Sequence, residues 1–107
     1  MQFIINGEEW TVLRASPNHP KLRRADGSTT VAVCDDDVKT IYVSENVQGA
    51  FLRKVLCHEI THAAMFSYNV ILSLDQEELI ADIIATYGAE IIDITNKLFN
   101  QLKGSYY

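Results

Sequence analysis

The sequence is short of the residues that characterise several large classes of protein. It has two cysteines, Cys34 and Cys57, too few for the disulfide framework of a small secreted domain. Its nine lysines and arginines are outnumbered by fourteen aspartates and glutamates, and the formal net charge is −5. The basic residues form no stripe that could follow a phosphate backbone. We therefore expect reduced thiols and no nucleic-acid partner.

Long uninterrupted apolar runs are also missing. The first ten residues, MQFIINGEEW, contain no basic region followed by an apolar core, so we expect no signal peptide. The most apolar stretch, residues 79–94, is interrupted by Asp82, Glu90 and Asp93 and should not cross a membrane. With 48% hydrophobic and 21% charged residues, the chain has the composition of an ordinary globular protein. We expect one cytoplasmic domain over residues 1–107 and no membrane partner.

The first half of the chain has the pattern of short strands. The segments QFIIN and WTVLRA flank GEE, and TTVAVC and KTIYVS flank DDDV. Alternating apolar residues on either side of a short polar turn are typical of a β-hairpin. The sequence therefore predicts two antiparallel hairpins.

The second half has the period of helices. From about Val47 the apolar residues cover more than half of a helical circumference, so this helix should lie inside the domain. Ser73 and Gln76 fit a capping box, which predicts the start of a second helix running toward Gly104. Gly88 is a position where that helix could kink or divide. Strands followed by helices predict an α+β fold.

Two of the three histidines stand four residues apart in the sequence VLCHEITHAAM, residues 55–65. On a helix, side chains at this spacing lie about 5–6 Å apart, so His58 and His62 could both bind one zinc ion. Glu59 is rotated by about 100° from His58, and it could contact a zinc-bound water without binding the metal. The spacing predicts a zinc site with Glu59 as general base.

The third ligand is expected in the sequence EELIAD, because a catalytic zinc usually has three protein ligands and one open position. Glu78 and Asp82 share a face of the second helix, so one carboxylate can bind zinc while the other accepts a hydrogen bond from a ligand histidine. We assign Glu78 as the ligand and Asp82 as the supporting residue. Small side chains on or next to this face, at Ala81, Ala85 and Ala89, would let the two helices approach closely.

The chemistry expected of such a site is amide hydrolysis. Zinc lowers the pKa of a bound water from about 15.7 to about 7. Glu59 would take a proton from this water and pass it to the leaving amine. A further group should stabilise the oxyanion, and Tyr68, Tyr87, Tyr106 and Tyr107 are all candidates.

HEITH followed by EELIAD resembles the zinc metallopeptidases called gluzincins. The wider context, KTIYVSENVQGAFLRKVLCHEITHA and then EELIADIIATYG, is most similar to the small intracellular ImmA/IrrE-type peptidases and their phage-borne relatives. The resemblance implies a zincin-like domain with one zinc per chain bound by His58, His62 and Glu78. It implies that Glu59 is the catalytic base and that Asp82 supports a ligand histidine. It also implies that KTIYVS is the edge strand above the cleft, where an extended substrate could add by backbone hydrogen bonds.

Three hypotheses of function follow from these residues. The first is a zinc-dependent peptidase that acts on a cytoplasmic protein or peptide, by analogy a repressor-like regulator in a phage or mobile-element setting. A regulatory protein partner would then contribute specificity. The second is a non-catalytic zinc-stabilised module that binds a protein, in which Glu59 is incidental. The third is a metal-free interaction protein, in which His58, His62 and Glu78 have no metal-related role.

Overall fold

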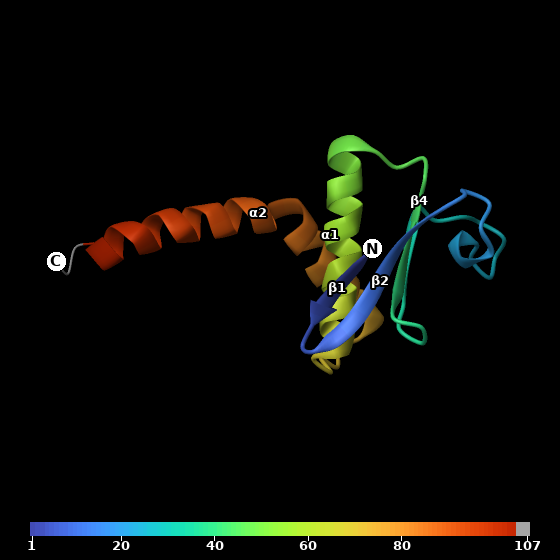
Figure 1. Cartoon of the computed structure of the whole chain (residues 1–107), viewed down its shortest axis with the longest axis horizontal. Coiled ribbons are helices and arrows are strands. Elements are labelled where there is room, and N and C mark those ends of the chain that lie inside the picture. The colour runs from blue at the N-terminus through green and yellow to red at the C-terminus, as the bar shows by residue number, and fades with distance from the viewer. Residues whose placement is uncertain (105–107) are drawn as a thin grey trace.

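The computed structural model describes residues 1–104, which form a four-stranded sheet with two helices beside it (Figure 1). In chain order the elements are β1 (Gln2–Ile5), β2 (Glu8–Ala15), the short 3₁₀ helix η1 (Pro20–Leu22), β3 (Ala32–Asp35), β4 (Thr40–Ser44), α1 (Gly49–Ser67) and α2 (Leu74–Gly104). The fold is therefore α+β. Cys34 and Cys57 are both free thiols. None of the helices in this part of the chain is long and apolar enough to cross a membrane.

The sheet has the strand order β1-β2-β4-β3 and mixed pairing. Both predicted hairpins are confirmed, because β1 pairs with β2 and β3 pairs with β4 in antiparallel fashion. The parallel pairing of β2 with β4 was not predicted. The prediction that KTIYVS is an edge strand is wrong, since β4 lies between its neighbours and β3 forms the edge. Thr40, Ile41, Val43 and Ser44 of β4 are all buried, a pattern typical of a strand covered on both faces.

Trp10 lies at the centre of the core between the sheet and α1. Its ring is fully buried and stacks with Phe3 and Phe66, with ring centroids 6.4 Å apart in each pair. The indole N–H donates a hydrogen bond of 2.8 Å to Ser67 Oγ. Because this buried bond joins β2 to the last turn of α1, it fixes the helix against the sheet. The rest of the core cluster is formed by Ala32, Ile41, Val43, Val47, Val55 and Ala63.

Both ends of the connection between the helices are capped. At the end of α1, the Val70 N–H donates to the Met65 carbonyl at 2.9 Å, and Asn69 adopts a left-handed φ of 54°, as in a Schellman motif. At the start of α2, the Ser73 N–H donates to Gln76 Oε1 at 3.1 Å, and the Gln76 N–H donates to Ser73 Oγ at 3.2 Å. The predicted capping box is confirmed. Together the caps determine how the first turns of α2 meet α1.

Helix α2 is not divided at Gly88, and its second half extends away from the rest of the molecule (Figure 1). Ala81 is fully buried and Ala85 is half-buried, as expected for small residues where two helices approach. The same expectation is wrong for Ala89, which is exposed. Gly88, one position earlier, is half-buried instead.

Helix α1 contacts β1, β3, β4 and α2, in agreement with its predicted place inside the domain. Its apolar surface is not fully covered, however, because the Phe51 side chain is 54% exposed and Leu56 and Ile60 are half-buried. The helix therefore buries two faces and leaves part of an apolar flank open.

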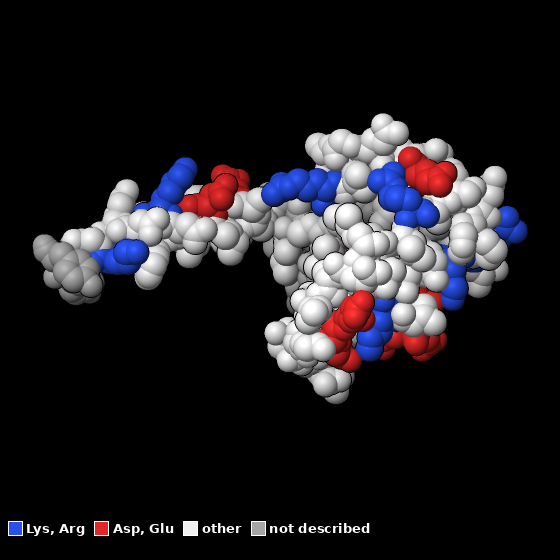
Figure 2. Space-filling view, in the orientation of Figure 1, with Lys and Arg blue, Asp and Glu red and all other residues white. Residues whose placement is uncertain are grey.

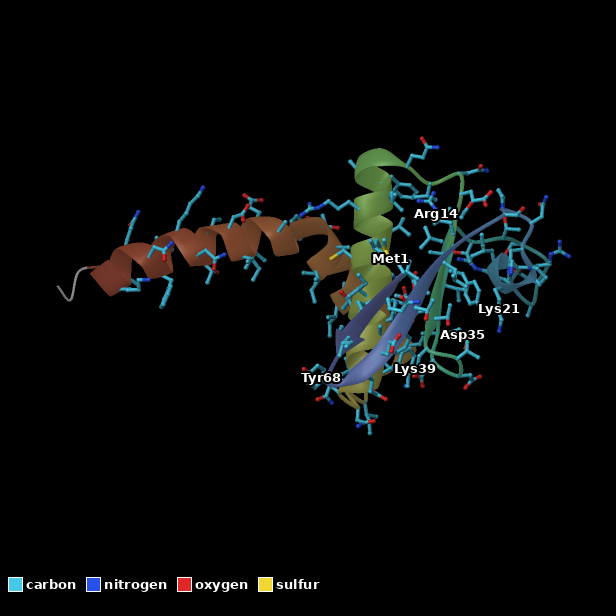
Figure 3. All side chains as sticks on the ribbon, viewed as in Figure 1. Met1, Arg14, Lys21, Asp35, Lys39 and Tyr68 are labelled. Carbon is cyan, nitrogen blue, oxygen red and sulfur yellow. The ribbon has the colours of Figure 1, made fainter. Side chains whose placement is uncertain are left out.

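Charged side chains of both signs are scattered over the face shown in Figure 2. Lys21 Nζ lies 2.7 Å from Asp35 Oδ2, which ties η1 to the end of β3 (Figure 3). Lys39 Nζ lies 3.1 Å from Glu8 Oε2, which joins the turn before β4 to β2. These exposed pairs contribute little to stability individually. They hold the loops around the sheet in place.

Candidate metal centre

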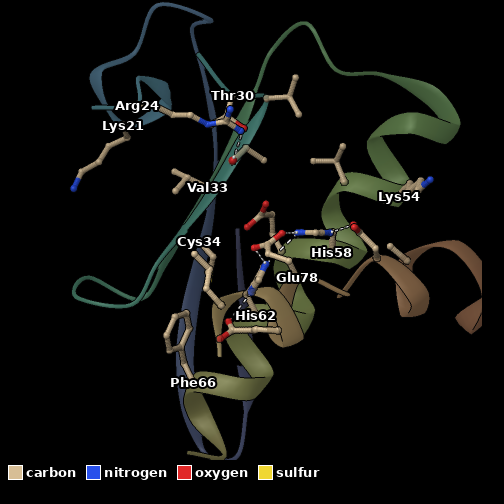
Figure 4. A pocket seen from close by; sticks show the side chains of 18 of the residues that line it. Lys21, Arg24, Thr30, Val33, Cys34, Lys54, His58, His62, Phe66 and Glu78 are labelled. Carbon is tan, nitrogen blue, oxygen red and sulfur yellow. Dashed lines mark hydrogen bonds and ion pairs between the residues drawn. The ribbon is translucent and has the colours of Figure 1, made fainter. Parts of the chain in front are cut away.

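The two helices bring together the side chains that the sequence analysis selected. His58, Glu59 and His62 lie on α1, and Glu78 lies in the second turn of α2 (Figure 4). His58 Nε2 is 3.1 Å from His62 Nε2. Glu78 Oε2 is 3.2 Å from His58 Nε2, and Glu78 Oε1 is 2.9 Å from His62 Nε2. The three residues form a small acceptor triangle, in which the two Nε2 atoms contact different oxygens of Glu78.

The size of this triangle fits a metal ion. Ligand atoms about 2.0–2.1 Å from a tetrahedral zinc are about 3.3 Å apart. The contacts of 2.9, 3.1 and 3.2 Å are close to that value, and the two contacts of Glu78 are made by different oxygens. With one ligand atom taken from each residue, the three atoms lie within 4.8 Å of one another. Two imidazoles and a carboxylate are also a ligand set that suits zinc. The three residues therefore have the ligand chemistry of a metal site and lie close enough together to be a candidate for one.

A second layer of carboxylates fixes the orientation of both imidazoles. Asp82 Oδ1 lies 2.9 Å from His58 Nδ1, and Glu77 Oε1 lies 2.6 Å from His62 Nδ1. An ionised carboxylate can only accept a hydrogen bond, so each Nδ1 carries the hydrogen. In the neutral imidazoles, both Nε2 atoms then present lone pairs to the Glu78 carboxylate. Three acceptors that converge in this way are an arrangement that a bound cation would satisfy.

The carboxylates around the two histidines also favour a cation. Four carboxylates, those of Glu59, Glu77, Glu78 and Asp82, line the cleft that contains the two histidines. Within residues 1–104, none of these carboxylates forms an ion pair with a lysine or arginine. Four cationic side chains of the described residues line the same cleft without pairing with these carboxylates, so a metal ion held beside the histidines would add to the stabilisation of the negative charge there.

Glu59 differs from the other three carboxylates. Its residue is only 8% exposed, and within residues 1–104 its side chain has neither a hydrogen bond nor an ion pair. Burial raises the pKa of Glu59, and the nearby His62 and His58 oppose this shift. A carboxylate with free oxygens and a raised pKa is suited to accept and return a proton.

The site faces a cleft of about 1000 Å³ between β3 and the two helices. Ala32, Val33 and Cys34 of β3 line the opposite wall, and in the described part of the chain β3 is paired on one side only. Burial raises the pKa of the Cys34 thiol to about 12. The thiol is therefore neutral at physiological pH, and we assign it to the wall of the cleft rather than to its chemistry.

The two predicted oxyanion candidates that the structure describes do not lie at the site. Tyr68 and Tyr87 are 59% and 55% exposed and are not among the residues that line the cleft. Tyr106 and Tyr107 lie outside the described residues. The residues that could stabilise negative charge in the cleft are cations instead, namely Lys21, Arg23, Arg24 and Lys54.

Glu77 was missed by the sequence analysis. Adjacent side chains on a helix point about 100° apart, so the search by helix face selected Glu78 and Asp82 and passed over their neighbour. A signal was nevertheless present. His58 and His62 are one turn apart, so each needs its own acceptor for Nδ1–H, and Asp82 can serve only one of them.

Replacing Glu77 with alanine is expected to weaken zinc binding about 10- to 100-fold, the usual cost of removing a carboxylate that orients a ligand histidine. His62 would keep its position on α1 and lose the acceptor that fixes its tautomer. Competition with a chromophoric chelator measures the affinity. Asp75→Ala is the matched control, because Asp75 is an exposed acid in the same first turn of α2. Equal affinities in the two variants would contradict the role of Glu77.

Comparison with models of known protein families, with curated protein sequences and with solved structures gave no match. The likeness to gluzincins and to ImmA/IrrE-type peptidases therefore stays a prediction from the sequence.

Proposed function

We propose that this protein is a zinc-dependent peptidase with a zincin-like active site, acting on cytoplasmic proteins or peptides. The observation that carries the proposal is the convergence of His58, His62 and Glu78 into a triangle of acceptors whose ligand atoms, one from each residue, lie within 4.8 Å of one another. The nearby Glu59 adds what catalysis needs besides a metal, namely a buried carboxylate with no other partner among the described residues.

The roles of the residues follow from their positions. A zinc ion held by His58, His62 and Glu78 would activate a water molecule and polarise the carbonyl of the scissile bond. Glu59 accepts a proton from the attacking water and returns it to the nitrogen of the leaving amine. Glu77 and Asp82 hold the imidazoles in the tautomer that directs Nε2 toward the metal.

The free edge of β3 supports a polypeptide substrate. β3 lines the cleft, and its outer edge offers backbone N–H and C=O groups opposite the site. An extended peptide can pair with such an edge and lie across the metal centre. This assigns to β3 the role that the sequence analysis gave to KTIYVS.

Zinc removal tests the proposed function. The zinc-loaded protein is incubated with a mixture of unstructured peptides, and new termini are identified by mass spectrometry. We expect cleavage that a chelator abolishes and added zinc restores, because the acceptor triangle needs the ion. If the protein binds one zinc per chain and cleaves nothing, the non-catalytic zinc module is the better description. If neither zinc nor cleavage is found, both hypotheses fail.

A further inference from the structure

The part of α2 from Tyr87 to Leu98 carries large apolar side chains that are exposed in the described part of the chain. It projects beyond α1 (Figure 1), and in the view of Figure 3 side chains extend from it both above and below. Tyr87, Ile91, Ile94 and Leu98 are 49–55% exposed on this arm. Charged side chains occupy only a few places along it (Figure 2). A surface of this kind on a helix is usually covered by another protein surface.

The spacing of the apolar residues indicates which kind of structure could cover them. Steps of four and three residues alternate without interruption along one stripe, which is the a/d pattern of a coiled coil. The stripe consists of Ile80, Ile84, Tyr87, Ile91, Ile94 and Leu98. A stripe of this kind packs best against a second helix with the same spacing.

We propose that a second copy of this chain covers the arm, with the two α2 helices packed antiparallel. In this arrangement Ile91 packs against the partner's Ile94, and Tyr87 packs against the partner's Leu98. The two-fold axis repeats each contact, so both stripes are buried together.

The charges beside the stripe favour the antiparallel direction. Glu90 and Lys97 both occupy the position that directly precedes an a residue, on the same side of the stripe. In the antiparallel pair, Glu90 faces the partner's Lys97, and symmetry gives this ion pair twice. In a parallel pair, Glu90 would face the partner's Thr95 and no ion pair would form. Two copies of the arm are therefore complementary in charge only when they pack antiparallel.

An apolar groove at the base of the arm continues the same surface. Leu56, Ile60 and Ala64 of α1 line it together with Ile84, which also belongs to the stripe. In the antiparallel register the last turns of the partner's α2 lie opposite Ile84. They would cover the apolar flank of α1 that the monomer leaves open.

Sedimentation equilibrium of the full chain tests the arrangement. We expect a mass of twice 12.1 kDa for the wild type. Glu90→Lys should raise the dissociation constant about tenfold, because two ion pairs are lost and two repulsions are gained. Lys97→Glu should do the same, and the double charge exchange should restore the wild-type value. Asp93→Lys is the control, because Asp93 lies on the far side of the helix from the stripe.

Ile91→Asp provides a second variant, which should give a monomer that still binds zinc, because Ile91 is remote from the metal centre. The zinc content also shows that the variant is folded, and it does not depend on peptidase activity. A wild type that is monomeric at every concentration would overturn the proposal and leave the arm to a different protein. A dimer that neither charge reversal weakens would overturn the antiparallel register.

Discussion

Replacing Glu78 with alanine is expected to lower the zinc content of the purified protein from about one ion per chain to nearly none. Glu78 is the only carboxylate in the acceptor triangle, with oxygens 3.2 and 2.9 Å from the two Nε2 atoms. Its loss leaves two neutral imidazoles, which bind zinc weakly by themselves. The affinity should fall by more than the roughly 100-fold that an orienting carboxylate can cost. Elemental analysis of untagged protein measures the effect.

Asp93→Ala is the matched control for this experiment. It removes one carboxylate from the same helix at an exposed position, so it reproduces the change in net charge without touching the site. We expect it to keep its zinc. If neither the wild type nor the control contains zinc after reconstitution, the metal site is wrong, and the metal-free interaction protein becomes the best description.

Replacing Glu59 with glutamine is expected to leave the zinc content unchanged and to lower kcat for peptide hydrolysis about 10²- to 10⁴-fold. Glutamine has the shape of glutamate and cannot accept a proton from water at neutral pH. The metal should stay bound, because Glu59 is not part of the acceptor triangle. The combination of retained metal and lost turnover separates a catalytic carboxylate from a structural one.

Glu45→Gln, at an exposed position after β4, controls for the loss of a negative charge. It should change neither zinc content nor turnover. A Glu59→Gln protein as active as the wild type would contradict the role of Glu59 as general base. A Glu59→Gln protein that loses its zinc would show that the carboxylate supports the metal site.

The sequence predicted the parts of this molecule that depend on local patterns. The capping box at Ser73 and the two hairpins follow from residues close together in the chain, and the structure confirms them. The meeting of His58, His62 and Glu78 was predicted because a helix fixes the relative directions of side chains four residues apart. A single contact between α1 and α2 then brings Glu78 to the two histidines.

The features that were missed depend on long-range pairing or on chemistry beyond the helix face. Whether a strand lies at the edge of a sheet is decided by a segment far away in the chain, here β2 for β4. The residues TIYV are consistent with a strand buried on both faces. Burial on both faces, however, does not show which strand pairs with β4. Glu77 could be found only by asking what each imidazole needs for Nδ1, a question about hydrogen-bond capacity rather than spacing.

The small buried area of α2 has a consequence for the stability of the whole chain. Of its 31 residues, Ala81 is the only one that is buried. Apolar packing of α2 against α1 is therefore incomplete, and the polar contacts of His58 and His62 with the α2 carboxylates add to it. With zinc bound at the proposed site, metal loading and the joining of the two helices would become a single equilibrium. Because a ligand bound only by the folded state stabilises it in proportion to the logarithm of its concentration, the melting temperature of this protein should follow the supply of free zinc in its surroundings.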